Sequence, residues 1–360
     1  MNKKVTFLIA DVTFIGGIER VNSLLANKFA KDDFEVNIVS LYNTNNVINY
    51  TLDAGVNLSF INNKPYSGKP KSLTRFFSHI KSLFRLYRNM LKYKEGVFII
   101  NTFPLAFLLY PFAFFRNCVV IEHVHYSYYG KKAQLIRNFI YRKFKKVVCV
   151  NKNDVLLFSK YLDNVCFLPN PLSFTAEKST SLDEKKIIAV GRLEYQKGFD
   201  RLIDIFSEVN KNVAGWQLHI YGVGNYKNEL EDKIQSYGLE NVKLMGSVDN
   251  LEKIYPDYSI FAFSSRFEGF GMVLTEAMEC GLPCISFDCP TGPGEILENG
   301  KYGVLIQDND IKGYQLKLEQ LMQSKPLRVE YSSLSKIRSA DFNLDPIFDK
   351  WKRLVSEANK

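Results

Sequence analysis

Two kinds of hydrophobic pattern alternate along this chain. Short runs of β-branched and aromatic residues are separated by longer stretches in which apolar positions recur every three or four residues. The runs that we predict as strands are Val5–Ala10, Val36–Leu41, Val97–Asn101, Val119–Glu122, Val147–Asn151, Ile187–Val190, Leu218–Tyr221, Val242–Met245, Ile260–Ser264 and Cys284–Phe287. Strands that alternate with helices are typical of βαβ units, so we predict an α/β fold with a parallel sheet in each half.

The predicted boundary between the halves lies at Pro169-Asn-Pro171, followed by a polar stretch from Thr175 to Lys186. The two prolines exclude a helix and interrupt any strand pairing there. With 360 residues, the chain is long enough for two domains. We therefore expect an N-terminal domain at 1–170 and a C-terminal domain at 171–344. The final segment, 345–360, has an apolar stripe at helical spacing and is expected to pack back on the first domain (Ile347, Phe348, Trp351, Leu354, Val355).

The overall composition, 46% hydrophobic and 24% charged, is that of a soluble globular protein. The apolar stretch 103–115 contains prolines and is too short for a membrane span. The apolar start, 1–10, is interrupted by Asp11 and lacks a cleavage site, so it is interpreted as a strand and not as a signal peptide. Six cysteines in mostly strand-like segments fit reduced thiols of a cytoplasmic protein, and no metal site is expected at Cys280, Cys284 and Cys289.

The net charge of +9 is divided unequally between the halves. Residues 1–170 contain 24 Lys and Arg against 10 Asp and Glu, whereas the remainder contains 23 against 28. Fold stability does not require this division, but attraction of the first half to an anionic partner would explain it.

Two basic segments account for much of this charge. The segment 69–94 contains eight cations and no acid, with apolar residues at helical spacing between them, and 131–146 is similar, with Tyr128, Tyr129, Phe139, Tyr141 and Phe144 nearby. We predict a membrane or lipid-diphosphate contact through Lys71, Arg75, Lys81, Arg85 and Arg88, and thus a cytoplasmic protein held peripherally on the inner face of the plasma membrane. The alternative is a helix packed on its sheet with a solvated cationic face. No nucleic-acid partner is expected, because these segments lie within α/β elements.

The most informative segment for chemistry runs from Ser264 to Pro283. A strand leads into a loop that contains Gly269 and Gly271, where a helix begins. The free N–H groups at a helix start suit a phosphate. Glu268 on the loop and Glu276 in the helix are eight residues apart, so they could bind hydroxyl groups on either side of a diphosphate. The alternative is a surface loop with two solvated glutamates.

A second phosphate-binding candidate is the turn Gly191–Gly198, which directly follows a predicted strand. Ligands bind at the carboxyl ends of strands in open α/β sheets. Arg192 and Lys197 in this turn could hold a diphosphate and neutralise its charge as it leaves. Taken alone, the turn could equally be an ordinary basic one.

Together, these two segments resemble the donor-site signatures of retaining glycosyltransferase family 4. Further similarities extend over most of the chain, at Phe14–Arg20, Ile220–Gly224, Gly246–Val248 and Asp288–Glu295. The last of these resembles a variant of bacterial polysaccharide and lipid-linked glycan transferases. The resemblance implies the GT-B fold, in which two Rossmann-like domains face each other across a cleft and the C-terminal helix crosses back. It also implies that the N-terminal domain, 1–170, binds the acceptor and that the C-terminal domain, 171–344, binds the donor.

The resemblance also implies roles for individual residues. Arg192 and Lys197 would bind the donor diphosphate, Glu268 the sugar hydroxyls and Glu276 the ribose. His123, at a predicted strand end, matches the family's active-site histidine better than His125 does. The further donor-binding residues implied are Gly16, Gly17, Gly191, Gly222, Gly246, Ser247, Val248, Phe270, Gly271, Met272 and Val273. Phe270 to Val273 would act through their backbone.

The implied reaction is transfer of a hexose or N-acetylhexosamine from a nucleoside-diphosphate sugar, above all a UDP-sugar, to a glycan or lipid-linked saccharide of a bacterial surface polysaccharide. Configuration is retained, and no metal or other cofactor takes part. Two alternatives stay open: a GT-B-fold nucleotide-sugar epimerase, and a non-catalytic module that binds nucleotide sugars or glycans. A dinucleotide-binding motif after Tyr221 is a poor match, since Lys227 stands where the third glycine would be.

Overall fold

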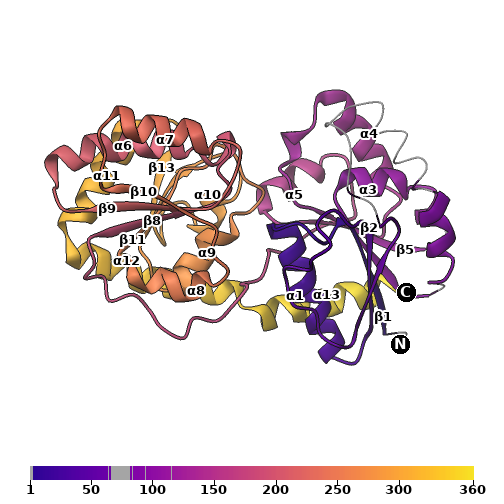
Figure 1. Ribbon diagram of the computed structural model, residues 1–360. Coiled ribbons are helices and arrows are strands. Elements are labelled where there is room, and N and C mark those ends of the chain that lie inside the picture. Colours follow the sequence, from indigo (N-terminus) through magenta and orange to yellow (C-terminus); the bar gives the residue numbers. More distant parts are fainter. Residues whose placement is uncertain (1–2, 64, 66–81, 83, 94, 115) are drawn as a thin grey trace. The chain divides into compact units, whose positions relative to one another are not determined.

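The computed structural model describes residues 3–63, 65, 82, 84–93, 95–114 and 116–360 (Figure 1). The chain divides into two compact units. Unit 1 comprises Met1–Ser173 and Asp345–Lys360, and unit 2 comprises Phe174–Leu344. The division falls three residues after the boundary expected at Asn170.

The sheet of unit 1 has seven parallel strands in the order β3-β2-β1-β4-β5-β6-β7. Its strands are β1 (Lys4–Asp11), β2 (Glu35–Tyr42), β3 (Val56–Phe60), β4 (Val97–Asn101), β5 (Asn117–Glu122), β6 (Lys146–Cys149) and β7 (Val165–Phe167). Among the described residues, its α-helices are α1 (Gly17–Lys31), α3 (Phe103–Leu108), α4 (Lys131–Tyr141), α5 (Lys152–Phe158) and α13 (Leu344–Ala358). Short 3-10 turns follow α3 at Phe112–Phe114 (η1) and β5 at Tyr126–Tyr128 (η2).

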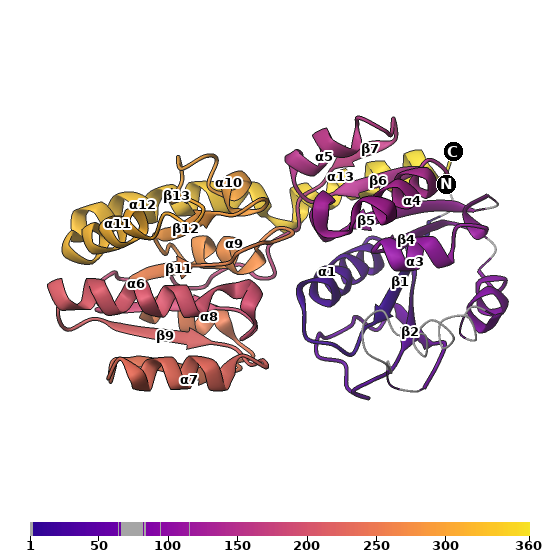
Figure 2. The same ribbon diagram turned by 90° about the horizontal axis from the view of Figure 1, so that it is seen from above.

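The sheet of unit 2 has six parallel strands in the order β10-β9-β8-β11-β12-β13. Its strands are β8 (Lys186–Val190), β9 (Gln217–Tyr221), β10 (Val242–Gly246), β11 (Ile260–Phe263), β12 (Cys284–Asp288) and β13 (Val304–Gln307). Its α-helices are α6 (Phe199–Asn212), α7 (Lys227–Ser236), α8 (Leu251–Ile254), α9 (Met272–Glu279), α10 (Pro293–Ile296), α11 (Ile311–Gln323) and α12 (Lys325–Ser339). Helices cover both faces of this sheet, with α6, α7 and α11 on one side and α8, α9 and α12 on the other (Figures 1 and 2).

All ten predicted strands are present, which confirms the α/β assignment. The hydrophobic pattern did not predict β3, β7 and β13, and each of these is an edge strand of its sheet. Edge strands are covered on fewer sides than central ones, so their residues need not be uniformly apolar. All of β7 and most of β3 are partly exposed, which explains why no hydrophobic run marked them.

The last helix, α13, packs on unit 1. The centre of its Phe348 ring lies 4.8 Å from that of the Phe29 ring in α1, edge to face. Asp345 of α13 pairs with Lys28 of α1 at 2.5 Å. The predicted stripe is buried along its whole length (Ile347, Phe348, Trp351, Leu354, Val355). The apolar face of α13 thus completes the core of unit 1 although it lies at the other end of the chain.

The six cysteines are free, and all but the partly exposed Cys166 are buried. In the part of the chain that the structure describes, no helix has the length and hydrophobicity that a bilayer crossing requires.

Candidate active site

Three glycines line up at the carboxyl edge of the unit 2 sheet, where β8, β9 and β10 end. The N–H of Gly191 donates to Tyr221 O at 2.9 Å, and that of Gly222 donates to Gly246 O at 2.8 Å. Gly222 has φ +147°, and a Cβ there would lie 1.8 Å from Gly191 O. Only glycine therefore allows these turns to approach so closely. Ser247 and Val248 follow directly, with Ser247 exposed.

The turn after β8 is joined to the loop after β11, although the two are about 70 positions apart in the sequence. The N–H of Arg266 donates to Gln196 O at 2.8 Å, and Gln196 Nε2 donates to Phe267 O at 2.9 Å. Ser264 Oγ donates to Lys197 O at 2.9 Å. The structure thus places the two segments with candidate phosphate-binding residues side by side.

Lys197 and Glu268 form an ion pair at this junction, with Nζ and Oε1 2.5 Å apart. Their side chains are only 13% and 8% exposed. Ser265 Oγ donates to the same carboxylate oxygen at 2.6 Å, and the ammonium lies 5.6 Å from the centre of the Phe263 ring. Both charged groups are therefore held in position, one by an aromatic face and the other by a hydroxyl.

Arg192 lies on the exposed side of the same turn. Its Nη2 donates to Gln196 Oε1 at 3.1 Å, so that Gln196 joins Arg192 to the loop that carries Glu268. Both predicted cations and Glu268 consequently belong to one hydrogen-bonded cluster. Gln196 was not singled out in the sequence, where a glutamine in a turn carries no signal.

Helix α9 begins beside this cluster. Gly271 is its N-cap, with φ +102°, and neither a capping side chain nor an acidic residue occupies its first turn, where Met272 and Val273 are partly exposed. Its free N–H groups and positive dipole end suit an anion. Glu276, one turn further on, is fully buried.

The Phe270 side chain is 3% exposed and packs edge to face on the Phe342 ring. Gly292 lies close to the backbone of Phe270, because a Cβ at this glycine would be 2.3 Å from Phe270 O. Thr291 Oγ1 donates to the carbonyl of Glu268. The segment after β12 therefore supports the loop that bears Glu268.

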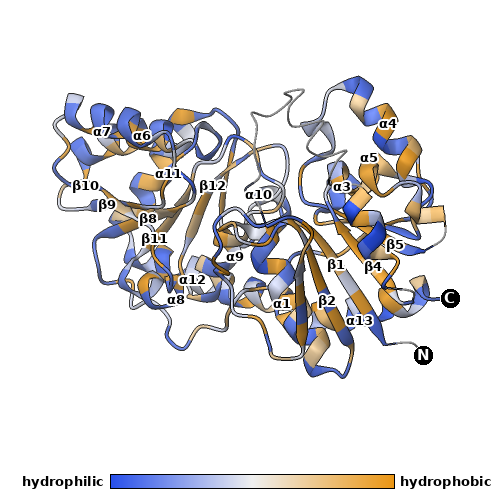
Figure 3. Cartoon of the chain, turned by 45° about the vertical axis from the view of Figure 1, so that its right-hand side comes forward, coloured by the Kyte–Doolittle hydropathy of each residue, from blue (hydrophilic) through white to orange (hydrophobic). Residues whose placement is uncertain are grey.

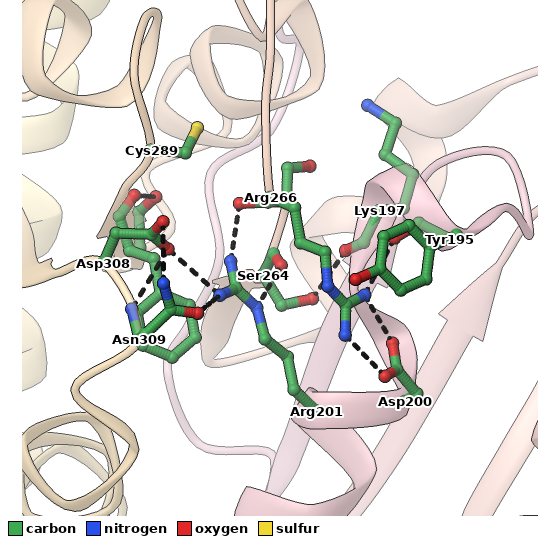
Figure 4. A network of polar contacts seen from close by, with 12 residues as sticks. Tyr195, Lys197, Asp200, Arg201, Ser264, Arg266, Cys289, Asp308 and Asn309 are labelled. Atoms are coloured by element: carbon green, nitrogen blue, oxygen red, sulfur yellow. Dashed lines mark hydrogen bonds and ion pairs between the residues drawn. The ribbon is translucent and has the colours of Figure 1, made fainter.

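Two arginines that the sequence analysis missed hold this loop in place (Figure 4). Arg201 of α6 donates to Ser264 O at 2.8 Å and to Ser265 O at 2.7 Å, and it pairs with Asp308 at 3.0 Å. Its guanidinium lies 4.0 Å from the centre of the Phe287 ring. The sequence signal that could have revealed Arg201 is its place among the apolar positions of the helix 199–212, where a charged side chain needs buried partners.

The second of them, Arg266, lies on the loop itself. It makes two hydrogen bonds with the Asp200 carboxylate, at 2.7 and 2.6 Å, and it stacks on Tyr195 with 4.0 Å to the ring centre (Figure 4). Two such bonds to a planar guanidinium fix orientation as well as distance. This pair ties the loop to the first turn of α6.

In unit 1, His123 follows the carboxyl end of β5 and contacts Asn101 at the end of β4, with Nε2 and Oδ1 2.8 Å apart. Asn101 Nδ2 donates to Leu8 O at 3.1 Å and to Asn22 Oδ1 at 2.8 Å. The amide nitrogen of Asn101 is thereby engaged, so the amide oxygen faces His123 and accepts a hydrogen bond from Nε2–H. The neutral imidazole then carries its lone pair on Nδ1.

His125 lies on the same loop, above a buried charged network. Arg137 of α4 and Glu122 of β5 are both fully buried and pair at 3.3 Å. Arg137 Nη2 donates to Tyr126 O at 2.6 Å, while Asp154 Oδ1 accepts from Tyr126 N at 2.8 Å. The loop that carries both histidines is therefore held at the two backbone atoms of Tyr126.

The remaining candidates lie at other points of unit 1. Gly16 is the N-cap of α1, which Gly17 begins, beyond the carboxyl end of β1. Arg85 donates to Asn62 Oδ1 at 3.1 Å, and the Arg88 side chain is exposed. Lys71, Arg75 and Lys81 lie outside the described residues. The aromatic residues Tyr141 and Phe144, expected on a lipid-facing surface, are instead 0% and 3% exposed and belong to the core.

Burial lowers the pKa of His123 to about 4, so the imidazole is expected to stay neutral through the physiological range. An unfolded histidine takes up its proton near pH 6.5, so unit 1 should lose stability as pH falls from there to about 4, by about 3 kcal/mol. Histidine NMR titration checks the pKa. Asn101→Asp should raise it by about one to two pKa units, because a carboxylate favours the imidazolium. An unchanged pKa in that variant would contradict the contact with Asn101.

Comparison with known proteins shows the family to which the chain belongs. The family described as glycosyl transferases group 1 matches residues 174–337, which lie within unit 2. Over 98% of its length, the chain is 31% identical to the amylovoran biosynthesis glycosyltransferase AmsD of Erwinia amylovora, of which 99% is covered.

The chain belongs to the group 1 glycosyltransferases.

This glycosyltransferase is also similar to a second curated protein and to a solved structure. The chain is 24% identical, over 98% of both chains, to the Campylobacter jejuni GalNAc-α-(1→4)-GalNAc-α-(1→3)-diNAcBac-PP-undecaprenol α-1,4-N-acetyl-D-galactosaminyltransferase. A solved structure of an S. aureus TarM mutant in complex with fondaparinux, α-GlcNAc-glycerol and UDP is similar in fold, with a TM-score of 0.80 and 18% identity over 98% of this chain and 99% of that one. The fold is that of the GT-B glycosyltransferases.

Proposed function

We propose that this glycosyltransferase moves a hexose or N-acetylhexosamine from a UDP-sugar to a glycan or lipid-linked saccharide, with retention of configuration and without a metal. The observation that carries the proposal is the Lys197–Glu268 pair at the carboxyl edge of the unit 2 sheet. It places a cation suited to a phosphate next to a carboxylate suited to sugar hydroxyls.

The groups around that pair support a nucleoside-diphosphate sugar as the donor. Lys197, Arg192 and the start of α9 supply positive charge for the diphosphate, and Glu268 accepts hydrogen bonds from the sugar. Glu276 is assigned to the ribose and the backbone at Gly246–Val248 to the base. UDP is favoured as the nucleotide because the TarM mutant structure holds UDP.

In the proposed reaction, the bond between the sugar C1 and the diphosphate oxygen breaks while C1 bonds to the acceptor oxygen on the same face. The acceptor proton moves to the departing phosphate, so no protein nucleophile is required. Negative charge develops on the diphosphate, and fixed cations stabilise it more effectively than a protein base would. His123, neutral and held by Asn101, is assigned to the transferred sugar.

The acceptor class rests on the relatives. The AmsD name refers to amylovoran biosynthesis, and the Campylobacter enzyme's name describes a saccharide on undecaprenyl diphosphate. Both are bacterial surface or lipid-linked glycans, so we assign an acceptor of that class and a peripheral place at the inner face of the plasma membrane to this protein.

A thermal-shift screen across UDP-, GDP- and dTDP-sugars tests the donor assignment. At a concentration of 100 times Kd, a UDP-sugar should stabilise the protein by about 2.7 kcal/mol, which corresponds to a Tm increase of about 5–10 °C. The Lys197→Ala variant should lose most of this shift. A shift with GDP-sugars alone would contradict the choice of nucleotide.

Transfer should continue undiminished in excess EDTA, because protein cations supply the charge that a metal would provide. NMR of the product should show the anomeric configuration of the donor. Loss of activity in EDTA, or inversion at C1, would overturn the corresponding part of the proposal.

Incubation of the donor without an acceptor separates transfer from epimerisation, because only an epimerase yields a new nucleotide sugar.

A further inference from the structure

Helix α4 of unit 1 has an unusual exposed face. Leu135, Ile136 and Phe139 are 67%, 47% and 61% exposed, whereas Ile140 and Tyr141 on the other side are buried in the core. A helix on the surface of a globular unit normally directs polar residues outward. In Figure 3, α4 accordingly carries hydrophobic as well as hydrophilic colours. The core of unit 1 leaves these three side chains uncovered.

The apolar surface continues from α4 to the turn after α3. The Phe139 ring lies 6.1 Å from that of Tyr110, which in turn lies 5.3 Å from that of Phe114. Phe107 and Phe114 are 48% and 52% exposed. We call this continuous surface the α4 patch, made of Leu135, Ile136, Phe139, Tyr110 and Phe114.

Cations lie along both ends of the patch. The segment 131–146 contains no acid, and five of its lysines and arginines are exposed (Lys131, Lys132, Arg142, Lys143, Lys145). The ammonium of Lys143 lies 4.9 Å from the centre of the Phe114 ring, so charge and aromatic surface are in direct contact. The other two cations of this segment differ: Arg137 points inward and pairs with the buried Glu122, and Lys146 is partly exposed and lies 3.9 Å from Glu357.

We propose that the α4 patch docks on an anionic lipid bilayer. Its apolar side chains would enter the boundary between headgroups and acyl chains, and its cations would lie level with the lipid phosphates. Charge complementarity favours this occupant over a second copy of the chain, whose own α4 patch is equally cationic. Nucleic acid would satisfy the cations but would leave Leu135 and Ile136 without a partner.

The patch is connected to the acceptor side of the proposed reaction. β5 ends at Glu122, His123 follows, and the loop through the half-exposed Tyr128 leads directly into α4. A bilayer at α4 would therefore bring lipid-linked saccharides to the loop that carries His123. The delivery of lipid-linked saccharides to this loop rests on the proposed function, but the binding of the α4 patch to lipid does not.

Flotation with vesicles tests the docking. The full-length protein is expected to float with vesicles containing phosphatidylglycerol and much less with pure phosphatidylcholine vesicles, and about 0.5 M salt should weaken the binding. Lys131→Ala with Lys132→Ala should lower the vesicle partition coefficient about 30-fold, since each cation near an anionic surface contributes about fivefold. The matched control, Lys312→Ala with Lys317→Ala on α11 of unit 2, removes the same charge and should bind as wild type does.

A second variant tests the apolar part. Leu135→Gln, Ile136→Gln and Phe139→Gln together should lower the partition coefficient about 100-fold. Glutamine is a good helix former and these positions are exposed, so α4 should stay folded. Leu316→Gln with Ile337→Gln, at exposed positions of α11 and α12, is the control.

Unchanged flotation of either α4 variant would overturn the proposal, as would binding that is independent of lipid charge. Patch-dependent dimerisation in sedimentation experiments, or patch-dependent binding to RNA without flotation, would identify a different occupant and also overturn it. The thermal shift with a UDP-sugar reports the unit 2 site and should be equal in all variants. Absence of that shift together with patch-dependent flotation would contradict the proposed function and leave the docking surface standing.

Discussion

Lys197→Ala is expected to lower kcat/KM for sugar transfer about 10³-fold. The ammonium is the proposed partner of the departing diphosphate, and its side chain is only 13% exposed, so water cannot replace it fully. Arg192 in the same turn is more exposed, so its removal should cost less. Steady-state kinetics with saturating and limiting donor checks whether the loss appears in kcat as well as in KM.

Lys211→Ala is the matched control for this prediction, because that lysine is exposed on α6 and pairs with the exposed Glu208 three positions earlier. It should leave transfer unchanged. Glu268→Gln keeps the shape of the site and an oxygen for Ser265, yet removes the carboxylate, and should also impair transfer strongly. Normal activity in both Lys197→Ala and Glu268→Gln would refute the site assignment in unit 2.

Arg137→Met is expected to be the most destabilising of these substitutions, with a loss of about 3–5 kcal/mol and a fall in Tm of about 10 °C. The guanidinium is fully buried, pairs with the buried Glu122, and lies 4.6 Å from the centre of the Phe158 ring. Without it, the Glu122 carboxylate would be buried with no cation. Thermal and denaturant unfolding measure the effect.

The pH dependence of this loss provides a sharper test. Burial raises the pKa of Glu122 to about 7, although Arg137 acts in the opposite direction. Removal of Arg137 should raise that pKa further, so the folded variant keeps the proton that the unfolded chain releases near pH 4.5. Its stability deficit should therefore grow as pH rises above 7 and shrink below it.

Arg142→Met is the control, because Arg142 lies at the exposed end of the same helix. The double variant with Glu122→Gln should recover part of the lost stability, since it removes the uncompensated charge. A deficit that is independent of pH would indicate lost packing of Arg137 on its aromatic neighbours and would contradict the electrostatic explanation.

The sequence by itself determined the central strands and the positions of the glycine-containing turns. A strand covered on both faces is largely apolar, so β1, β4 and β8 contain uninterrupted hydrophobic runs, at 7–10, 97–100 and 187–190. Gly222 and Gly271 have positive φ angles, which favour glycine over other residues, so the residue type itself indicates these turns. The stripe of α13 was likewise visible, because helical periodicity is a local property.

Only the tertiary structure decided which groups meet. The Lys197–Glu268 pair and the contacts of Arg201 join residues more than 60 positions apart, and no local pattern encodes such a distance. The same holds for exposure on α4, where Phe139 is open to solvent while Ile140 and Tyr141 are buried, because the sheet and the neighbouring helices determine which side of a helix is covered. Edge strands such as β7 depend on pairing with one neighbour more than on their own burial, and this is why hydrophobicity alone did not reveal them.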